Sequence, residues 1–107
     1  MGSHALPPLL RCSGIRKPHA KALMGIYEYQ GVVDGRPCYQ QAGVSSGNNV
    51  WFAQDTPEGP MWVITPKTSG LGGTPNGAIA RSASRAWWPW EVESWSVCGR
   101  THKFVVQ

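Results

Sequence analysis

The sequence predicts an all-β fold, with a single small domain of six or seven antiparallel strands that meander in chain order and curl into a barrel or a small sandwich. Short runs rich in Val, Ile, Thr, Tyr and Trp alternate with turn residues, which is typical of such folds. The 107 residues include 13 Gly and 9 Pro, and Leu71 is the only leucine after Leu23, so strong helix formers are scarce. Six tryptophans can fill much of a small core, since burying one large aromatic side chain contributes roughly 2–3 kcal/mol.

The first 24 residues predict a flexible basic segment ahead of the domain. Residues 1–4, Met-Gly-Ser-His, have the form of an expression-tag remnant. Residues 5–24 combine prolines with four basic residues and no acid, so we expect a disordered N-terminal leader. The alternative is a basic arm that touches acidic partners. The β domain is then expected to span residues 25–107.

A hairpin is predicted at the start of this domain. The β-rich runs 26–33 and 36–41 flank Asp34-Gly35, and Asp-Gly between two such runs favours a type I′ turn. Pro37 has no amide hydrogen for a ladder, so we expect it at a strand edge or a bulge.

The run Met-Trp-Val-Ile-Thr at residues 61–65 is the stretch around which the other strands are expected to lie. Pro and Gly flank it on both sides, which indicates a short buried strand. It is expected to pair with residues 50–53 through the turn at 55–59.

The C-terminal part of the chain begins with a glycine-rich loop at residues 69–77. No Gly-Lys-Ser/Thr follows these glycines, so we interpret them as a mobile hairpin loop and not as a phosphate-binding loop. Next we predict a weak strand at residues 78–82 and an irregular stretch at 83–88. A strand with a bulge near Ser94 is predicted at 90–97. A turn at 98–102 and a closing strand at 103–107 end the chain.

The net charge of +4 comes from the leader. Residues 1–24 carry four basic side chains and no acidic one, whereas residues 25–107 carry six of each sign. A neutral domain argues against nucleic-acid binding, because phosphate contacts need clustered positive charge.

Cysteine and hydropathy patterns favour a reducing, cytoplasmic location. Cys12, Cys38 and Cys98 are three widely spaced cysteines without a Cys-x-x-Cys pair, which indicates free thiols and no zinc site. A Cys38–Cys98 bridge remains an alternative if the first and last hairpins are neighbours. No apolar run approaches the ~20 residues of a membrane span, and no secretion signal is recognisable.

The titratable residues do not form a recognisable catalytic set. His19 and His102 lack an identifiable orienting partner, as a Ser–His or Cys–His mechanism would need. Glu91 and Glu93 would lie about 7 Å apart on one strand face, a spacing that a glycosidase can use. On an exposed strand such a pair is usually a solvated face, so we expect no enzyme activity, no metal and no cofactor.

The cluster Trp87-Trp88-Pro89-Trp90 is the sharpest candidate for a binding site. One small sheet cannot easily bury three tryptophans around a proline, so we expect Trp90 in the core and Trp87 or Trp88 at the surface. Exposed indoles stack on sugars, proline-rich peptides or bases. The site residues predicted to accompany Trp87 and Trp88 are the flanking cations and the two carboxylates, namely Arg81, Arg85, Glu91 and Glu93.

Several short pieces together resemble a small Trp- and Gly-rich β module that recurs in large multidomain proteins of algae and protists. The first pieces are Gly25-x-Tyr27 and Gly35-Arg36-Pro37-x-Tyr39. They are followed by Trp51-Phe52, Trp62-x-Ile64, Ala80-x-Ser82 and Pro89-Trp90-x-Val92. The long 69–77 loop and the Trp cluster depart from the pattern of that module. The resemblance implies an accessory or interaction module, and it assigns no functional residue.

These observations predict a noncatalytic module that binds a protein or peptide through an exposed Trp-rich surface. The alternative is a carbohydrate-binding module that stacks sugars on Trp87 and Trp88, with Glu91 and Glu93 as hydrogen-bond acceptors. A single-stranded nucleic-acid binder ranks third because of the neutral domain. We expect a monomer or a weak dimer, since an unpaired edge strand can associate with a second copy.

Overall fold

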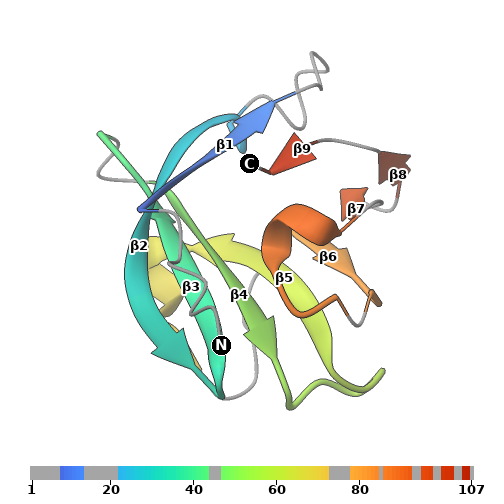
Figure 1. Ribbon diagram of the computed structural model, residues 1–107. Helices are drawn as coiled ribbons and strands as arrows, with labels where there is room; N and C mark the ends of the chain where they lie inside the picture. The colour runs from blue at the N-terminus through green and yellow to red at the C-terminus, as the bar shows by residue number, and fades with distance from the viewer. Residues whose placement is uncertain are drawn as a thin grey trace, which may run out of the picture.

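The computed structural model describes residues 8–13, 22–43, 47–72, 78–84, 86–92, 95–97, 100–102 and 105–106. These residues form one antiparallel sheet and two single-turn 3-10 helices (Figure 1). The strands are β1 (Leu9–Ser13), β2 (Gly25–Val33), β3 (Arg36–Gln41), β4 (Asn48–Ala53), β5 (Met61–Pro66), β6 (Ala80–Ser82), β7 (Trp95–Val97), β8 (Arg100–His102) and β9 (Val105–Val106). The helices are η1 (Lys67–Ser69) and η2 (Pro89–Glu91). None of the described helices has the length and apolarity needed to cross a membrane.

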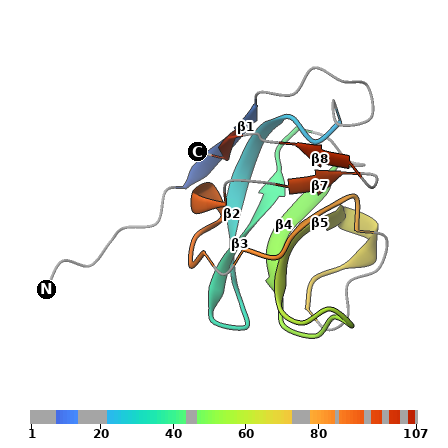
Figure 2. The ribbon, with the colours of Figure 1, turned by 90° about the vertical axis from the view of Figure 1, so that its right-hand side faces the viewer.

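The all-β antiparallel meander is confirmed. Strands β1 to β8 pair in chain order, and β9 pairs with β1 at the far edge instead of with β8. Only two residues separate His102 from Val105, so their Cα atoms lie at most about 11 Å apart. The two edges of the sheet are therefore close together, and the sheet curls into a partly open barrel (Figure 2).

The predicted hairpins occur as expected. Asp34 and Gly35 have φ values of 50° and 83°, as a type I′ turn requires. Pro37 lies opposite Val32, beyond the part of β3 that pairs with β4, so no ladder to β4 needs its missing amide hydrogen. Strand β5 lies inside the sheet between β4 and β6, and its first five residues are buried.

Apolar side chains pack on both faces of the central strands. The larger cluster fills the inside of the curl and draws on strands β1 to β7; its largest members are Trp62, Trp95, Tyr27, Tyr39 and Phe52. A smaller cluster lies on the outer face, because Trp51 and Val63 face each other across β4 and β5 on the side opposite Phe52 and Trp62. Two buried faces explain the unbroken apolar run in β5.

The predicted boundary at Gly25 is wrong for part of the leader, because residues 9–13 form β1. This strand pairs with β2 and β9, and Leu10 and Cys12 are 1% and 0% exposed. Leu23 is also fully buried, and its carbonyl accepts a 2.7 Å hydrogen bond from the Tyr27 hydroxyl. The domain therefore includes β1. The remainder of the predicted leader, residues 1–7 and 14–21, lies outside the described residues.

The buried amide of Gln41 attaches the chain just before β2 to the sheet. Its Nε2 donates to the carbonyls of Ala22 and Met24 at 3.0 and 2.9 Å. Its Oε1 accepts from the backbone and side-chain nitrogens of Asn48 at 3.1 and 3.2 Å. Because these buried polar groups satisfy one another, residues 22–24 belong to the folded domain.

The prediction of one strand over residues 90–97 is also corrected. Pro89 starts the helical turn η2, since its fixed φ and missing amide hydrogen suit the first helical position. Strand β7 is limited to Trp95–Val97, and the predicted turn at 98–102 contains β8 instead. With β8 and the N-terminal β1, the sheet holds nine strands among the described residues, two of which the sequence did not predict. The expected bulge near Ser94, like residues 73–77 of the glycine-rich loop, lies outside the described residues.

Candidate binding surface around Trp87

The segment 86–92 carries the exposed aromatic residue of the predicted site. Two serine side chains hold the backbone that leads into this segment. The Ser82 hydroxyl accepts a hydrogen bond from the Ser84 amide at 3.2 Å, and the Ser84 hydroxyl accepts one from the Ala86 amide at 3.1 Å. The Ala86 carbonyl then accepts hydrogen bonds from Arg36 Nη1 at 2.6 Å and from Trp62 Nε1 at 2.8 Å. The backbone immediately before Trp87 is therefore fixed to strands β3 and β5.

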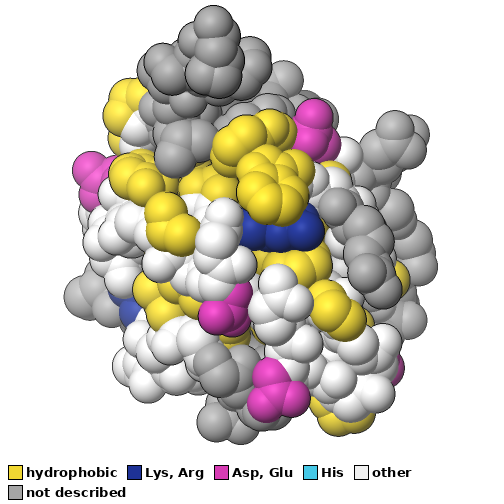
Figure 3. Space-filling model, turned by 60° about the horizontal axis from the view of Figure 1, so that its bottom comes forward, with side chains coloured by type: hydrophobic (Ala, Val, Ile, Leu, Met, Phe, Trp, Pro, Cys, Tyr) yellow, Lys and Arg dark blue, Asp and Glu magenta, His cyan; other side chains and the backbone are white. Residues whose placement is uncertain are grey.

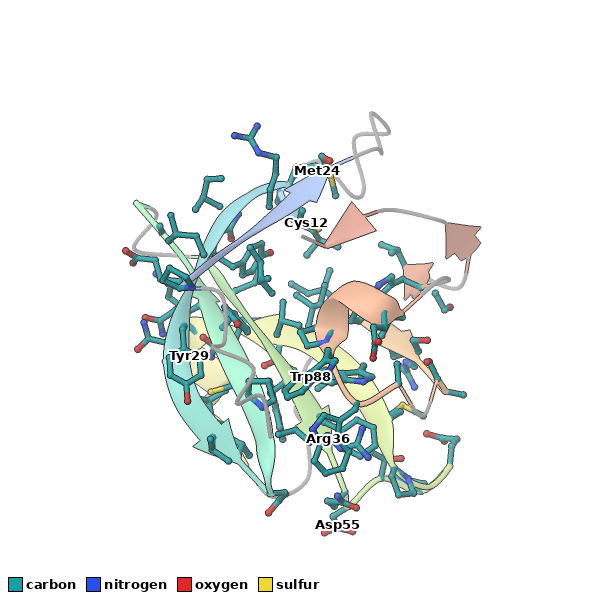
Figure 4. The ribbon with its side chains drawn as sticks, viewed as in Figure 1. Cys12, Met24, Tyr29, Arg36, Asp55 and Trp88 are labelled. Atoms are coloured by element: carbon teal, nitrogen blue, oxygen red, sulfur yellow. The ribbon has the colours of Figure 1, made fainter. Side chains whose placement is uncertain are left out.

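The side chain of Arg36 lies between two aromatic rings. Its guanidinium carbon is 3.9 Å from the ring centroid of Phe52 and 4.5 Å from that of Trp87. Phe52 in turn packs edge-to-face on Trp62, with centroids 5.4 Å apart. A planar guanidinium can stack on both rings while donating to the Ala86 carbonyl, which a lysine ammonium cannot do. Figure 4 labels Arg36 on β3 and Trp88 just before η2; Trp87 connects them, since it contacts both side chains.

Trp87 is held in place and still exposed. It covers Arg36 on one side and meets Trp88 edge-to-face, with centroids 6.2 Å apart and an interplanar angle of 89°. Trp88 is half-buried, and the following Pro89 is buried. The Trp87 side chain nevertheless remains 52% exposed. We name the surface formed by Arg36, Trp87 and Trp88 the Trp87 surface.

The structure brings together some of the predicted site residues and separates others. Trp87 and Trp88 are in contact, and Glu91 is exposed on η2, which follows them directly. Arg81 lies opposite Val63, on the sheet face away from Phe52 and Trp62, so the prediction that it accompanies the Trp cluster is wrong. It faces Glu58 at 3.9 Å in a solvent-exposed ion pair.

The predicted pair of carboxylates, Glu91 and Glu93 on one strand face, does not form in that way. Glu91 belongs to η2 and not to a strand, so the strand spacing of about 7 Å does not apply to it. Glu93 and Arg85 lie outside the described residues, as does the side chain of Trp90 that was expected in the core.

Arg36 is the residue that the site prediction missed. Cation–π contacts were expected from the basic residues nearest to the Trp cluster in sequence, whereas Arg36 is 51 residues before Trp87. The available signal was the Gly-Arg-Pro piece directly after the Asp-Gly turn. That signal gave no reason to place the arginine beside Trp87, because the contact depends on how the sheet curls.

The described residues offer no activated nucleophile among the cysteines. Cys12 and Cys38 are buried free thiols, as predicted, while Cys98 lies outside the described residues. Burial raises the pKa of Cys12 to about 12 and also raises the pKa of Cys38, so both thiols are protonated at neutral pH. Among the described side chains, no group of three or more His, Cys, Asp or Glu residues is arranged to hold a metal ion.

Comparison with known proteins assigns no family: no family model, no curated protein and no solved structure matches the chain. The resemblance to the Trp- and Gly-rich module therefore remains an expectation. The geometry of the Trp87 surface is the observation from which a function can be argued.

Proposed function

We propose that the protein is a noncatalytic binding module that takes a protein or peptide partner on the Trp87 surface. The observation that carries this proposal is that Trp87 is 52% exposed although three neighbouring groups fix it. Those groups are the Arg36 guanidinium, the Trp88 ring and the anchored Ala86 carbonyl.

A fixed and exposed tryptophan suits binding for two physical reasons. Tryptophan is among the residues that contribute most to protein–protein affinity, because its large apolar surface is desolvated on contact. A side chain that is already held in one orientation loses little further conformational entropy when a partner binds. The stack on Arg36 supplies that orientation in the free protein.

The two alternative ligand classes have less support. A sugar could also stack on Trp87, but Glu91 is not part of the strand-borne carboxylate pair expected to accept its hydroxyls. A nucleic acid requires cations beside the stacking ring. Apart from Arg36, the described basic side chains of Arg11, Lys67 and Arg81 lie on β1, on η1 and on the outer face of β6.

The proposal is tested with Trp87→Ala and a matched control, Leu9→Ala. Leu9 is an exposed apolar residue on β1 with nearly the same exposed fraction, 51% against 52%. Leu9→Ala should unfold within about 0.5 kcal/mol of the wild type, whereas Trp87→Ala loses its stack on Arg36 and should be about 1 kcal/mol less stable, so binding is compared under conditions where both variants are folded. Binding is then measured by tryptophan fluorescence and calorimetry against panels of peptides, oligosaccharides and oligonucleotides.

The expected result is that peptides bind the wild type and Leu9→Ala, and that Trp87→Ala binds them at least about tenfold more weakly. Binding of oligosaccharides or oligonucleotides alone would overturn the proposal in favour of the corresponding alternative. Peptide binding that Trp87→Ala leaves unchanged would place the partner elsewhere on the molecule.

A further inference from the structure

We infer that the partner on the Trp87 surface is a basic peptide segment, in which an arginine or lysine side chain packs along Trp87 and reaches the neighbouring carboxylates. This inference rests on the proposed function, and it adds the charge of the partner. It follows from the distribution of described charges around an exposed aromatic ring.

Three described carboxylates belong to segments next to those that form the Trp87 surface. Glu91 is exposed on η2, four residues after Trp87. Asp34 is exposed in the β2–β3 turn, two residues before Arg36. Asp55 lies below Arg36 at the same end of the sheet (Figure 4). Figure 3 shows this face, where hydrophobic side chains enclose a basic side chain and acidic side chains lie around them.

The Arg36 side chain on this face is half-buried and held by its neighbours, whereas the carboxylates of Asp34 and Glu91 are exposed. The guanidinium of Arg36 lies between Phe52 and Trp87 and donates to the Ala86 carbonyl. Asp34 is exposed in the β2–β3 turn, and Glu91 is exposed on η2. Among the described residues of this face, the exposed carboxylates therefore outnumber the half-buried Arg36, which favours a cationic partner and disfavours a carboxylate or a phosphate.

Arginine and lysine fit this arrangement because each combines an apolar stem with a charged end. The methylene stem can cover the exposed half of the Trp87 ring while the charged group stays near Asp34 or Glu91. An arginine can also make bidentate hydrogen bonds to a carboxylate. Apolar contact supplies affinity, and the carboxylates select the sign of the charge.

The test uses three peptides of equal length and equal apolar content, carrying arginine, glutamine or glutamate at the variable positions. The arginine peptide should bind the wild-type protein about tenfold more tightly than the glutamate peptide. The double variant Asp34→Asn/Glu91→Gln should bind the arginine peptide about fivefold more weakly, and this difference should shrink as NaCl rises from about 50 mM to about 500 mM.

The control is the double variant Glu28→Gln/Glu58→Gln, which removes two exposed carboxylates on β2 and in the β4–β5 turn. Its affinity for the arginine peptide should equal that of the wild type. Equal binding of all three peptides, or equal weakening by both double variants, would overturn the charge preference while leaving a Trp87-dependent peptide site intact. The proposed function fails separately, if no peptide binding depends on Trp87.

Discussion

Arg36 acts through the shape of its side chain as much as through its charge. Its guanidinium stacks between Phe52 and Trp87 and donates to the Ala86 carbonyl, so one side chain connects the first hairpin to the segment that carries the exposed tryptophan. A lysine keeps the charge but lacks a planar group that can contact two rings at once. Substitutions of Arg36 can therefore separate the contribution of the planar group from that of the charge.

Arg36→Ala should lower the free energy of unfolding by about 1–3 kcal/mol, because a stacked cation and a charged hydrogen bond are lost together. Arg36→Lys should recover less than half of this loss. Urea denaturation gives the free energies, and acrylamide quenching should show a more accessible tryptophan in both variants. If lysine restores full stability and protection from quenching, the stacking account is incorrect.

Cys12 makes stability depend on pH in the alkaline range. Burial raises its pKa from the ordinary value of 9.0 to about 12, so between these values the unfolded chain releases a proton that the folded chain keeps. The contribution of Cys12 to the free energy of unfolding should therefore be constant below about pH 8 and should fall as pH rises through 9 and above. Burial raises the pKa of Tyr27 as well, which acts in the same direction at higher pH.

The measurement is the slope of unfolding free energy against pH between about pH 8 and pH 11, for the wild type and for Cys12→Ala. The variant should be less stable at neutral pH, because it loses buried volume, but its slope should be shallower. Identical slopes would mean that Cys12 does not titrate as its burial implies.

At the scale of elements, β1 decides where the domain begins. Its two inward residues, Leu10 and Cys12, are buried, whereas Leu9 points outward and is 51% exposed. An element with one side in the core is structural, even though its sequence has the composition of a flexible segment.

Leu10→Ala should destabilise the protein by about 2–5 kcal/mol, the usual cost of truncating a buried leucine. Leu9→Ala, one residue earlier on the same strand, should change stability by less than about 0.5 kcal/mol. Denaturant titration of the two variants compares them directly. Equal and small effects would show that β1 contributes nothing to the fold and would restore the boundary at Gly25.

At the scale of the whole molecule, the sequence predicted the hairpins well because their signals are local. Asp34-Gly35 and the flanked run at residues 61–65 determine their structure from neighbouring residues alone. Strand β1 could not be predicted in this way, since Leu10 and Cys12 become core residues only through their partners in β2 and β9. Pro89 carried a local helix-start signal that the alternating pattern after it concealed.

The candidate site was predicted in part for the same reason. Trp87 and Trp88 stood out because three tryptophans around one proline exceed what a small sheet can bury. The contact of Arg36 with Trp87 and the position of Arg81 depend on which face of the curled sheet each side chain occupies. No short sequence motif predicts that face. Long-range contacts between segments far apart in the chain are the part that sequence reading did not recover.

The pairing of β1 with β9 has a mechanical consequence. Cys12 lies opposite Val106 and Ser13 opposite Val105, so the chain enters β1 and leaves β9 at the same end of a ladder of two residue pairs. A force that pulls these two ends apart loads the pairs one after another, as in a zipper, instead of shearing them all at once. Tension along the chain would thus open the barrel at this seam first, while the longer ladders between β2 and β5 stay intact.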